Sequence, residues 1–132
     1  MFFGLEGQTM ADILIIDDDT DFSGLVLQHF TTLGHIVTVA NNGTDGLKKA
    51  RAIKPNIIFL DVMMPDMNGI EVLRELHADD ETSDIPVLVM SAKFFDASML
   101  DLFTQERNCK EFIAKPVALS LLQQKTEALL KK

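Results

Sequence analysis

Four short apolar segments of this chain each end in a side chain that could take part in chemistry. An acidic run, a lone carboxylate, a hydroxyl and an amine follow them in that order: Asp17–Asp19 after Ile13–Ile16, Asp61 after Ile57–Leu60, Ser91 after Val87–Met90, and Lys115 after Phe112–Ala114. If the segments are neighbouring parallel strands, these side chains share the crevice beyond the strand carboxyl ends. Their oxygens could hold a divalent cation. A carboxylate nucleophile beside a hydroxyl and a cationic side chain could also react with a phosphoryl group.

The apolar segments that position these side chains have the length of strands and do not alternate with polar residues. Such runs are typical of strands buried on both faces of a parallel sheet. Between the runs, apolar residues recur at helical spacing, as Phe22, Val26 and Phe30 do. This alternation of strand and helix predicts an α/β domain with right-handed crossovers and helices on both faces of one sheet.

Turn and capping residues set the expected limits of the elements. The expected strands are Ile13–Ile16, His35–Ala40, Ile57–Leu60, Pro86–Met90 and Glu111–Ala114. The expected helices are a segment capped by Thr20 or Asp21 and stopped by Gly34, then Thr44–Lys54, then Gly69 to Leu76, then a segment capped by Asp96 or Ser98 that ends near Glu106, and last Leu119–Leu130. Leu25, Ile53 and Leu121 are expected on inward helix faces.

Composition limits the classes of function. The chain has 132 residues, 47% of them apolar, which fits one domain and excludes a disordered tail. A formal net charge of −8 argues against binding to nucleic acid or to an anionic membrane surface, and no apolar run reaches the ~20 residues of a membrane span. The single Cys109 has no disulfide partner, so a cytoplasmic location is expected. Residues 1–10 are expected to form a poorly ordered N-terminal extension and residues 11–132 the domain.

At the strand ends the chain resembles the receiver domain of bacterial two-component response regulators. The resemblance covers about residues 12–131 and rests on four motifs in order: Ile15–Asp19, Leu60–Pro65 with Asn68–Gly69, Met90–Ala92, and Phe112–Pro116. It implies a flavodoxin-like fold, a doubly wound (βα)5 three-layer sandwich whose five-stranded parallel sheet has the order 2-1-3-4-5.

The resemblance also implies roles for the acidic residues. Asp61 is the expected phosphoacceptor, which takes its phosphoryl group from a phosphohistidine on a partner. Asp18 and Asp61 are the expected direct ligands of Mg²⁺ (or Mn²⁺), Asp17 binds the ion through water, and the backbone carbonyl of Met63 completes the protein ligands. Oxygen ligands of this kind, with water and phosphate oxygens beside them, are those that Mg²⁺ prefers.

The residues after the last two strand segments are expected to respond to phosphorylation. Ser91 and the neighbouring Ala92 contact the phosphoryl oxygens, and Lys115 pairs with the carboxylate and later with the phosphoryl group. Phe112 stands at the position of the family's switch aromatic, and it lacks the hydroxyl of a tyrosine. Pro116 is the candidate for a cis peptide bond. Side chains of this kind respond to the charge of a new phosphoryl group and shift the domain between two conformations.

The implied partners are a sensor histidine kinase or a His-phosphotransfer protein on one side, and an effector protein or output domain on the other. The fourth helix, the fifth strand and the last helix form the expected effector face, which could also make a homodimer. No nucleic-acid or membrane partner is expected. The domain would not be an enzyme beyond its own phosphorylation and dephosphorylation. A stand-alone receiver and a part of a longer regulator both agree with the sequence.

Two other interpretations stay open at this point. The first is a small Mg²⁺-dependent phosphohydrolase with an Asp nucleophile on the first strand, in an Asp-x-Asp-x-Thr/Val pattern. Here Asp17 and Asp19 are followed by Asp21, so the last position differs. The second is a degenerate receiver that serves only as a binding module. By itself, Asp17–Asp19 could be only an acidic helix N-terminus favoured by the helix dipole. A second acidic run, Asp79–Asp84, is expected to be solvated surface.

Overall fold

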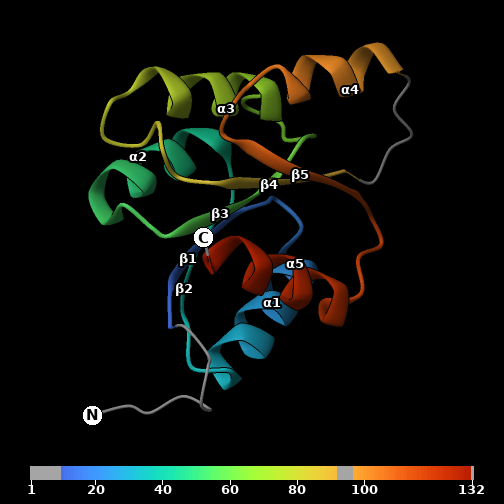
Figure 1. Ribbon diagram of the computed structural model, residues 1–132. Helices are drawn as coiled ribbons and strands as arrows, with labels where there is room; N and C mark the ends of the chain where they lie inside the picture. The colour runs from blue at the N-terminus through green and yellow to red at the C-terminus, as the bar shows by residue number, and fades with distance from the viewer. Residues whose placement is uncertain (1–9, 92–96, 132) are drawn as a thin grey trace.

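The computed structural model describes residues 10–91 and 97–131, and in it five parallel strands alternate with five helices (Figure 1). In chain order the elements are β1 (Asp12–Ile16), α1 (Thr20–Thr32), β2 (Ile36–Ala40), α2 (Gly43–Ile53), β3 (Ile57–Asp61), α3 (Gly69–Ala78), β4 (Val87–Ser91), α4 (Ala97–Thr104), β5 (Cys109–Ala114) and α5 (Leu119–Leu130). The sheet order is β2-β1-β3-β4-β5, which confirms the expected doubly wound, flavodoxin-like fold. No helix among the described residues has the length and apolar character that a membrane crossing requires.

Helices cover both faces of the sheet. Figure 1 shows α2, α3 and α4 on one side and α1 and α5 on the other. Because side chains alternate along a strand, β1 sends Leu14 and Ile16 into the core under α2 and α3, and Ile13 and Ile15 into the core under α1 and α5. All five residues of β3 are buried, as non-alternating runs predict.

The strand register brings the reactive side chains to one edge of the sheet. Ile16 in β1 lies beside Leu60 in β3, so the next residues, Asp17 and Asp61, lie at the same level at the carboxyl edge of the sheet. At the other end of the site, Ser91 in β4 pairs with Ala114 in β5, and Lys115 follows immediately. The carboxyl edge of the sheet therefore collects the acidic, hydroxyl and amine side chains.

The ends of several elements differ from the sequence expectation by a few residues. Helix α1 is capped by Asp19, whose Oδ1 accepts from the backbone N–H of Phe22 at 3.1 Å, and not by Thr20 or Asp21. The shift adds one or two residues to the helix because an Asp satisfies a free N–H of the first turn. Strand β4 extends to Ser91, and β5 begins at Cys109.

Helix α4 and three apolar side chains also depart from expectation. Helix α4 ends at Thr104 and contains Ser98, so Ser98 does not cap it, whereas the other candidate cap, Asp96, lies outside the described residues. Three side chains expected inward are exposed instead: Leu25 by 54%, Ile53 by 36% and Leu121 by 39%. Each helix contacts the sheet along a narrow stripe that does not include all of its apolar residues. These three side chains lie outside that stripe and are therefore exposed.

Candidate functional site

Three carboxylates gather where β1 and β3 end. One oxygen each from Asp17, Asp18 and Asp61 lies within 4.8 Å of the others. Asp17 and Asp61 are buried, whereas Asp18 is exposed. The sequence expectation that strand ends would bring these residues together is confirmed in this arrangement.

Both oxygens of Asp17 are already engaged. Its Oδ1 accepts from the backbone N–H of Asp19 at 2.9 Å, and its Oδ2 accepts from Nζ of Lys115 at 2.7 Å. Nζ of Lys115 lies 3.6 Å from Oδ1 of Asp61, so the Lys115 ammonium stands between two carboxylates and closer to Asp17. The same Nζ lies 4.7 Å from the centroid of the Phe22 ring, over its face, a cation–π contact that the sequence does not predict. Phe22 was expected only as a core residue of α1.

The electrostatics of the site disfavour the ionised forms of the two buried carboxylates, Asp17 and Asp61. Burial, followed by the charge of Asp17, raises the pKa of Asp61 from 3.8 to about 6. Burial also raises the pKa of Asp17, against the hydrogen bond from Lys115. For Lys115, burial acts to lower the pKa, but the hydrogen bond to Asp17 and the nearby carboxylate charges leave it above its usual value. The site therefore carries more negative charge than its neighbouring cation can neutralise.

The loop after Asp61 folds back under the site. The backbone N–H of Gly69 donates to the carbonyl of Val62 at 2.7 Å and closes the loop. A Cβ atom at position 69 would stand 2.7 Å from the Cα atom of Val62, so only glycine allows this approach. Asn68 and Glu71 form a capping box that starts α3 directly behind the loop.

The hydroxyl and amine side of the site comes from β4 and β5. Ser91 is buried at the last position of β4, and its carbonyl accepts from the backbone N–H of Lys115 at 2.7 Å. The Lys115–Pro116 peptide bond, the candidate for a cis bond, is cis. Phe112 is partly buried, and its ring meets that of Phe103 in α4 edge-on, with 5.4 Å between centroids. Ala92 lies outside the described residues.

The donor set fits a divalent cation. Carboxylate oxygens lie close together, one carboxylate is open to solvent, and their mutual repulsion needs a compensating charge. An acidic cluster of this kind is typical of the Mg²⁺ site of receiver domains.

The fold and this edge of the sheet define a class: a doubly wound α/β domain with an acidic cluster that could hold a metal ion, at the point where the strand order reverses. The sequence matches the response regulator receiver domain family over residues 13–127, and the chain belongs to that family. It is similar to the protein PilH of Pseudomonas aeruginosa, with 34% identity over 121 residues that cover 92% of this chain and 98% of PilH. The DNA-binding dual master transcriptional regulator RpaA of a Synechocystis species is 36% identical over 118 residues, and the match covers 83% of this chain but only 49% of RpaA.

Solved structures agree on the fold. A chemotaxis protein of Vibrio cholerae superposes with a TM-score of 0.85 at 22% identity and covers 92% of this chain and 100% of its own. A response regulator receiver domain protein of Methanospirillum hungatei superposes with a TM-score of 0.86 at 24% identity, over 93% of this chain and 95% of its own. Membership of the family implies a kinase partner and the role of a signalling switch that is typically not an enzyme.

The phosphohydrolase interpretation does not agree with the geometry. It requires the first strand to supply the nucleophile, but Asp17 at the end of β1 is fully buried and both of its oxygens accept hydrogen bonds. For the carboxylate of Asp61, at the end of β3, the only contact among the described residues is the 3.6 Å ion pair with Nζ of Lys115, which is longer than the contact of Lys115 with Asp17. Asp61 is thus the more available of the two carboxylates.

Proposed function

We propose that this domain is a phosphorylation-controlled switch in which Asp61 accepts a phosphoryl group. The observation that carries the proposal is the setting of Asp61: a carboxylate at a strand end, 3.6 Å from the Lys115 ammonium and within a cluster of three carboxylates. In the reaction, one oxygen of Asp61 bonds to phosphorus as the bond from phosphorus to the donor's imidazole nitrogen breaks. The bonding electron pair leaves with that nitrogen.

Mg²⁺ (or Mn²⁺), when bound, supplies positive charge to the oxygens of the transferred group. Asp18 and Asp61 are the proposed direct ligands, together with the backbone carbonyl of Met63. The hydrogen bonds that occupy both oxygens of Asp17 support an indirect role for it, through water. The exposure of Asp18 leaves its carboxylate accessible to an incoming ion.

The residues on the other side of the site would sense the phosphoryl group. The Lys115 ammonium already lies near Asp61 and would donate to a phosphoryl oxygen, and the hydroxyl of Ser91, with the backbone of Ala92, would contact another. The edge-on contact between Phe112 and Phe103 offers a route from the site to α4. We propose that this route changes the face made by α4, β5 and α5, where an effector, an output domain or a second copy would bind.

The proposed donor is a sensor histidine kinase or a His-phosphotransfer protein, whose phosphohistidine carries a reactive phosphorus–nitrogen bond. The domain then acts on itself and not on a separate substrate. We place this exchange in the cytoplasm, the reducing compartment in which the free thiol of Cys109 persists.

Intact mass spectrometry after incubation with acetyl phosphate and Mg²⁺ tests the proposal. One phosphoryl group is expected on the wild type and none on Asp61→Asn or on the wild type without Mg²⁺. Asp79→Asn, which changes a carboxylate at the opposite edge of the sheet, is the matched control and should be phosphorylated normally. An adduct that survives Asp61→Asn would contradict the assignment of the phosphoacceptor.

A further inference from the structure

The β3–α3 loop, residues 62–68, is held at both of its ends. At its start, Val62 is buried, and its N–H donates to the carbonyl of Met90 at 3.0 Å. At its end, Asn68 caps α3. Between these points Met64 and Met67 are partly buried against the core, whereas the side chain of Met63 is 47% exposed. The residue whose carbonyl is expected to face the cation is therefore not itself anchored in the core, and its position depends on a further restraint from the rest of the loop.

Asp66 supplies that restraint through the first turn of α2. Its Oδ1 accepts from the backbone N–H of Gly43 at 3.0 Å, and its Oδ2 accepts from the N–H and the hydroxyl of Thr44 at 2.9 and 2.8 Å. These donors, with the backbone N–H groups of Gly43 and Thr44 foremost, lower the pKa of Asp66 to about 2, so the carboxylate is ionised at neutral pH. A carboxylate at a helix N-terminus also interacts favourably with the helix dipole.

The contact between this loop and α2 is close as well as hydrogen-bonded. A Cβ atom at position 43 would stand 2.9 Å from the Cβ atom of Met67 and 2.9 Å from Cγ2 of Val72. The backbone of the first turn of α2 thus rests directly on the end of the loop and on α3. Asn42 caps the remaining donor of this turn, the N–H of Asp45, at 2.8 Å, so Asp66 does not duplicate the helix's own cap.

We propose that Asp66 is a positioning residue: by binding the first turn of α2, it holds the β3–α3 loop in the shape that presents the Met63 carbonyl to the cation. The inference rests on the proposed function. With Val62 fixed by β4 and residue 66 fixed by α2, the short arc between them has few conformations left. Restricting a loop before the ion binds removes an entropic cost from binding.

Mg²⁺ affinity measured by calorimetry, without any phosphoryl donor, tests the inference. Asp66→Ala should weaken Mg²⁺ binding about tenfold, the size of effect seen when groups that orient metal ligands are removed. Asp66→Asn keeps one acceptor oxygen and should recover part of the loss. Thr44→Val removes one of three hydrogen bonds and should weaken binding only about twofold. Amide exchange of residues 62–68 should rise in the same order.

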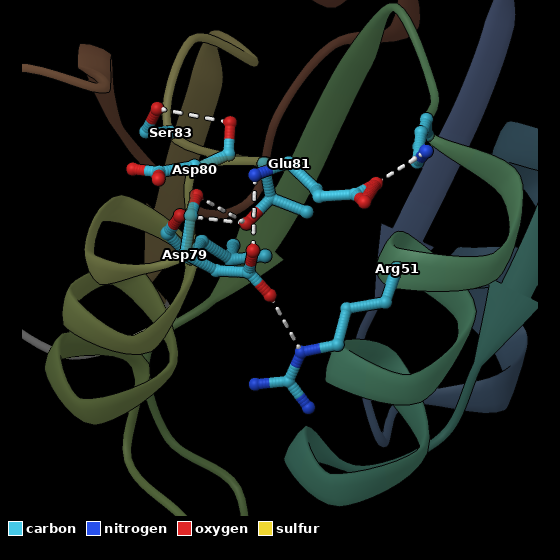
Figure 2. Close-up of polar contacts among 8 residues, drawn as sticks. Arg51, Asp79, Asp80, Glu81 and Ser83 are labelled. Carbon is cyan, nitrogen blue, oxygen red and sulfur yellow. Dashed lines mark hydrogen bonds and ion pairs between the residues drawn. The ribbon is translucent and has the colours of Figure 1, made fainter.

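The matched control is Asp79→Ala. Asp79 also links a loop to α2, at the far end of that helix, where its Oδ2 accepts from Nε of Arg51 at 3.1 Å and its Oδ1 from the N–H of Glu81 at 2.9 Å (Figure 2). Losing it should leave Mg²⁺ affinity and the exchange of residues 62–68 unchanged. If Asp79→Ala weakens Mg²⁺ binding as much as Asp66→Ala does, the effect is one of general stability and the inference fails.

Two further outcomes separate this inference from the proposed function. Wild type that binds Mg²⁺ but takes no phosphoryl group would overturn the proposed function and leave the role of Asp66 standing. Unchanged Mg²⁺ affinity and unchanged exchange in Asp66→Ala would overturn the inference, even if Asp61 is phosphorylated as proposed.

Discussion

The domain carries two acidic clusters, at opposite edges of its sheet, and they are built in opposite ways. At the carboxyl edge, the buried Asp17 and Asp61 share the ammonium of Lys115. At the other edge, in the loop between α3 and β4, Asp79 forms an ion pair with Arg51, and Glu81 forms a separate one with Lys54 (Figure 2).

The difference appears in the proton affinities. Burial and like charge raise the pKa of Asp61 to about 6, whereas a backbone hydrogen bond from Glu81 and the contact with Arg51 lower the pKa of Asp79. Exposed carboxylates that each have a cationic partner need no further positive charge. Buried carboxylates with too little positive charge around them favour the binding of a cation. This difference distinguishes an acidic run at a functional site from one on the solvated surface.

The largest contrast is expected from removing a lysine at each edge. Lys115→Met should lower the free energy of unfolding by about 3 kcal/mol without Mg²⁺, because it leaves the buried carboxylate of Asp17 without its ion pair. Lys54→Met, which breaks the exposed pair with Glu81, should change it little. Urea unfolding at low ionic strength measures both, and equal effects would contradict the contrast.

Mg²⁺ should act at one edge only. At a Mg²⁺ concentration a hundredfold above the dissociation constant, binding to the folded state should add about 2.7 kcal/mol to the free energy of unfolding. The effect should survive in Asp79→Asn and be largely lost in Asp61→Asn. Thermal unfolding at several Mg²⁺ concentrations checks this prediction, and a stabilisation that depends on Asp79 would place the ion at the wrong edge.

Asp61→Asn should stabilise the metal-free domain at pH 8 by about 3 kcal/mol. The pKa of Asp61 rises from 3.8 to about 6 on folding, so the folded state holds a proton that the unfolded state releases. The contribution of Asp61 to the free energy of unfolding is fully present below pH 3.8 and is lost as the pH rises through about 6. Unfolding curves of the two proteins should therefore converge near pH 4, and a constant difference between them across this range would disprove the pKa shift.

Asp79→Asn should give a smaller change of the opposite sign. Because folding lowers the pKa of Asp79, its contribution is present above pH 3.8 and is lost as the pH falls through the folded value. The variant should therefore be slightly less stable than wild type at neutral pH and equal to it in strong acid. Salt should reduce the difference, since the pair with Arg51 is exposed.

Much of the site follows from sequence alone because parallel strands place their carboxyl ends together. Non-alternating apolar runs predict buried strands, and the residue after each run then lies at a shared edge. For this reason Asp17, Asp61, Ser91 and Lys115 could be predicted to lie at one edge of a parallel sheet, whereas the order of the strands followed only from the resemblance to the receiver family. The limits of helices were less certain: the cap of α1 lies at Asp19, in a run where several Asp and Thr residues could serve equally.

What only the tertiary structure decided is how charge and contact are shared among these residues. The sequence cannot show that Lys115 lies nearer to Asp17 than to Asp61, because both distances depend on side-chain packing across three strands. It also gives no sign that Asp66 reaches the first turn of α2, since the 22 or more residues that separate the partners carry no local pattern linking them. The sequence by itself determined that each chemistry-bearing residue directly follows a buried strand, through the pattern of non-alternating apolar runs. The packing of helices on the sheet determined which carboxylates are paired and which are left for a cation.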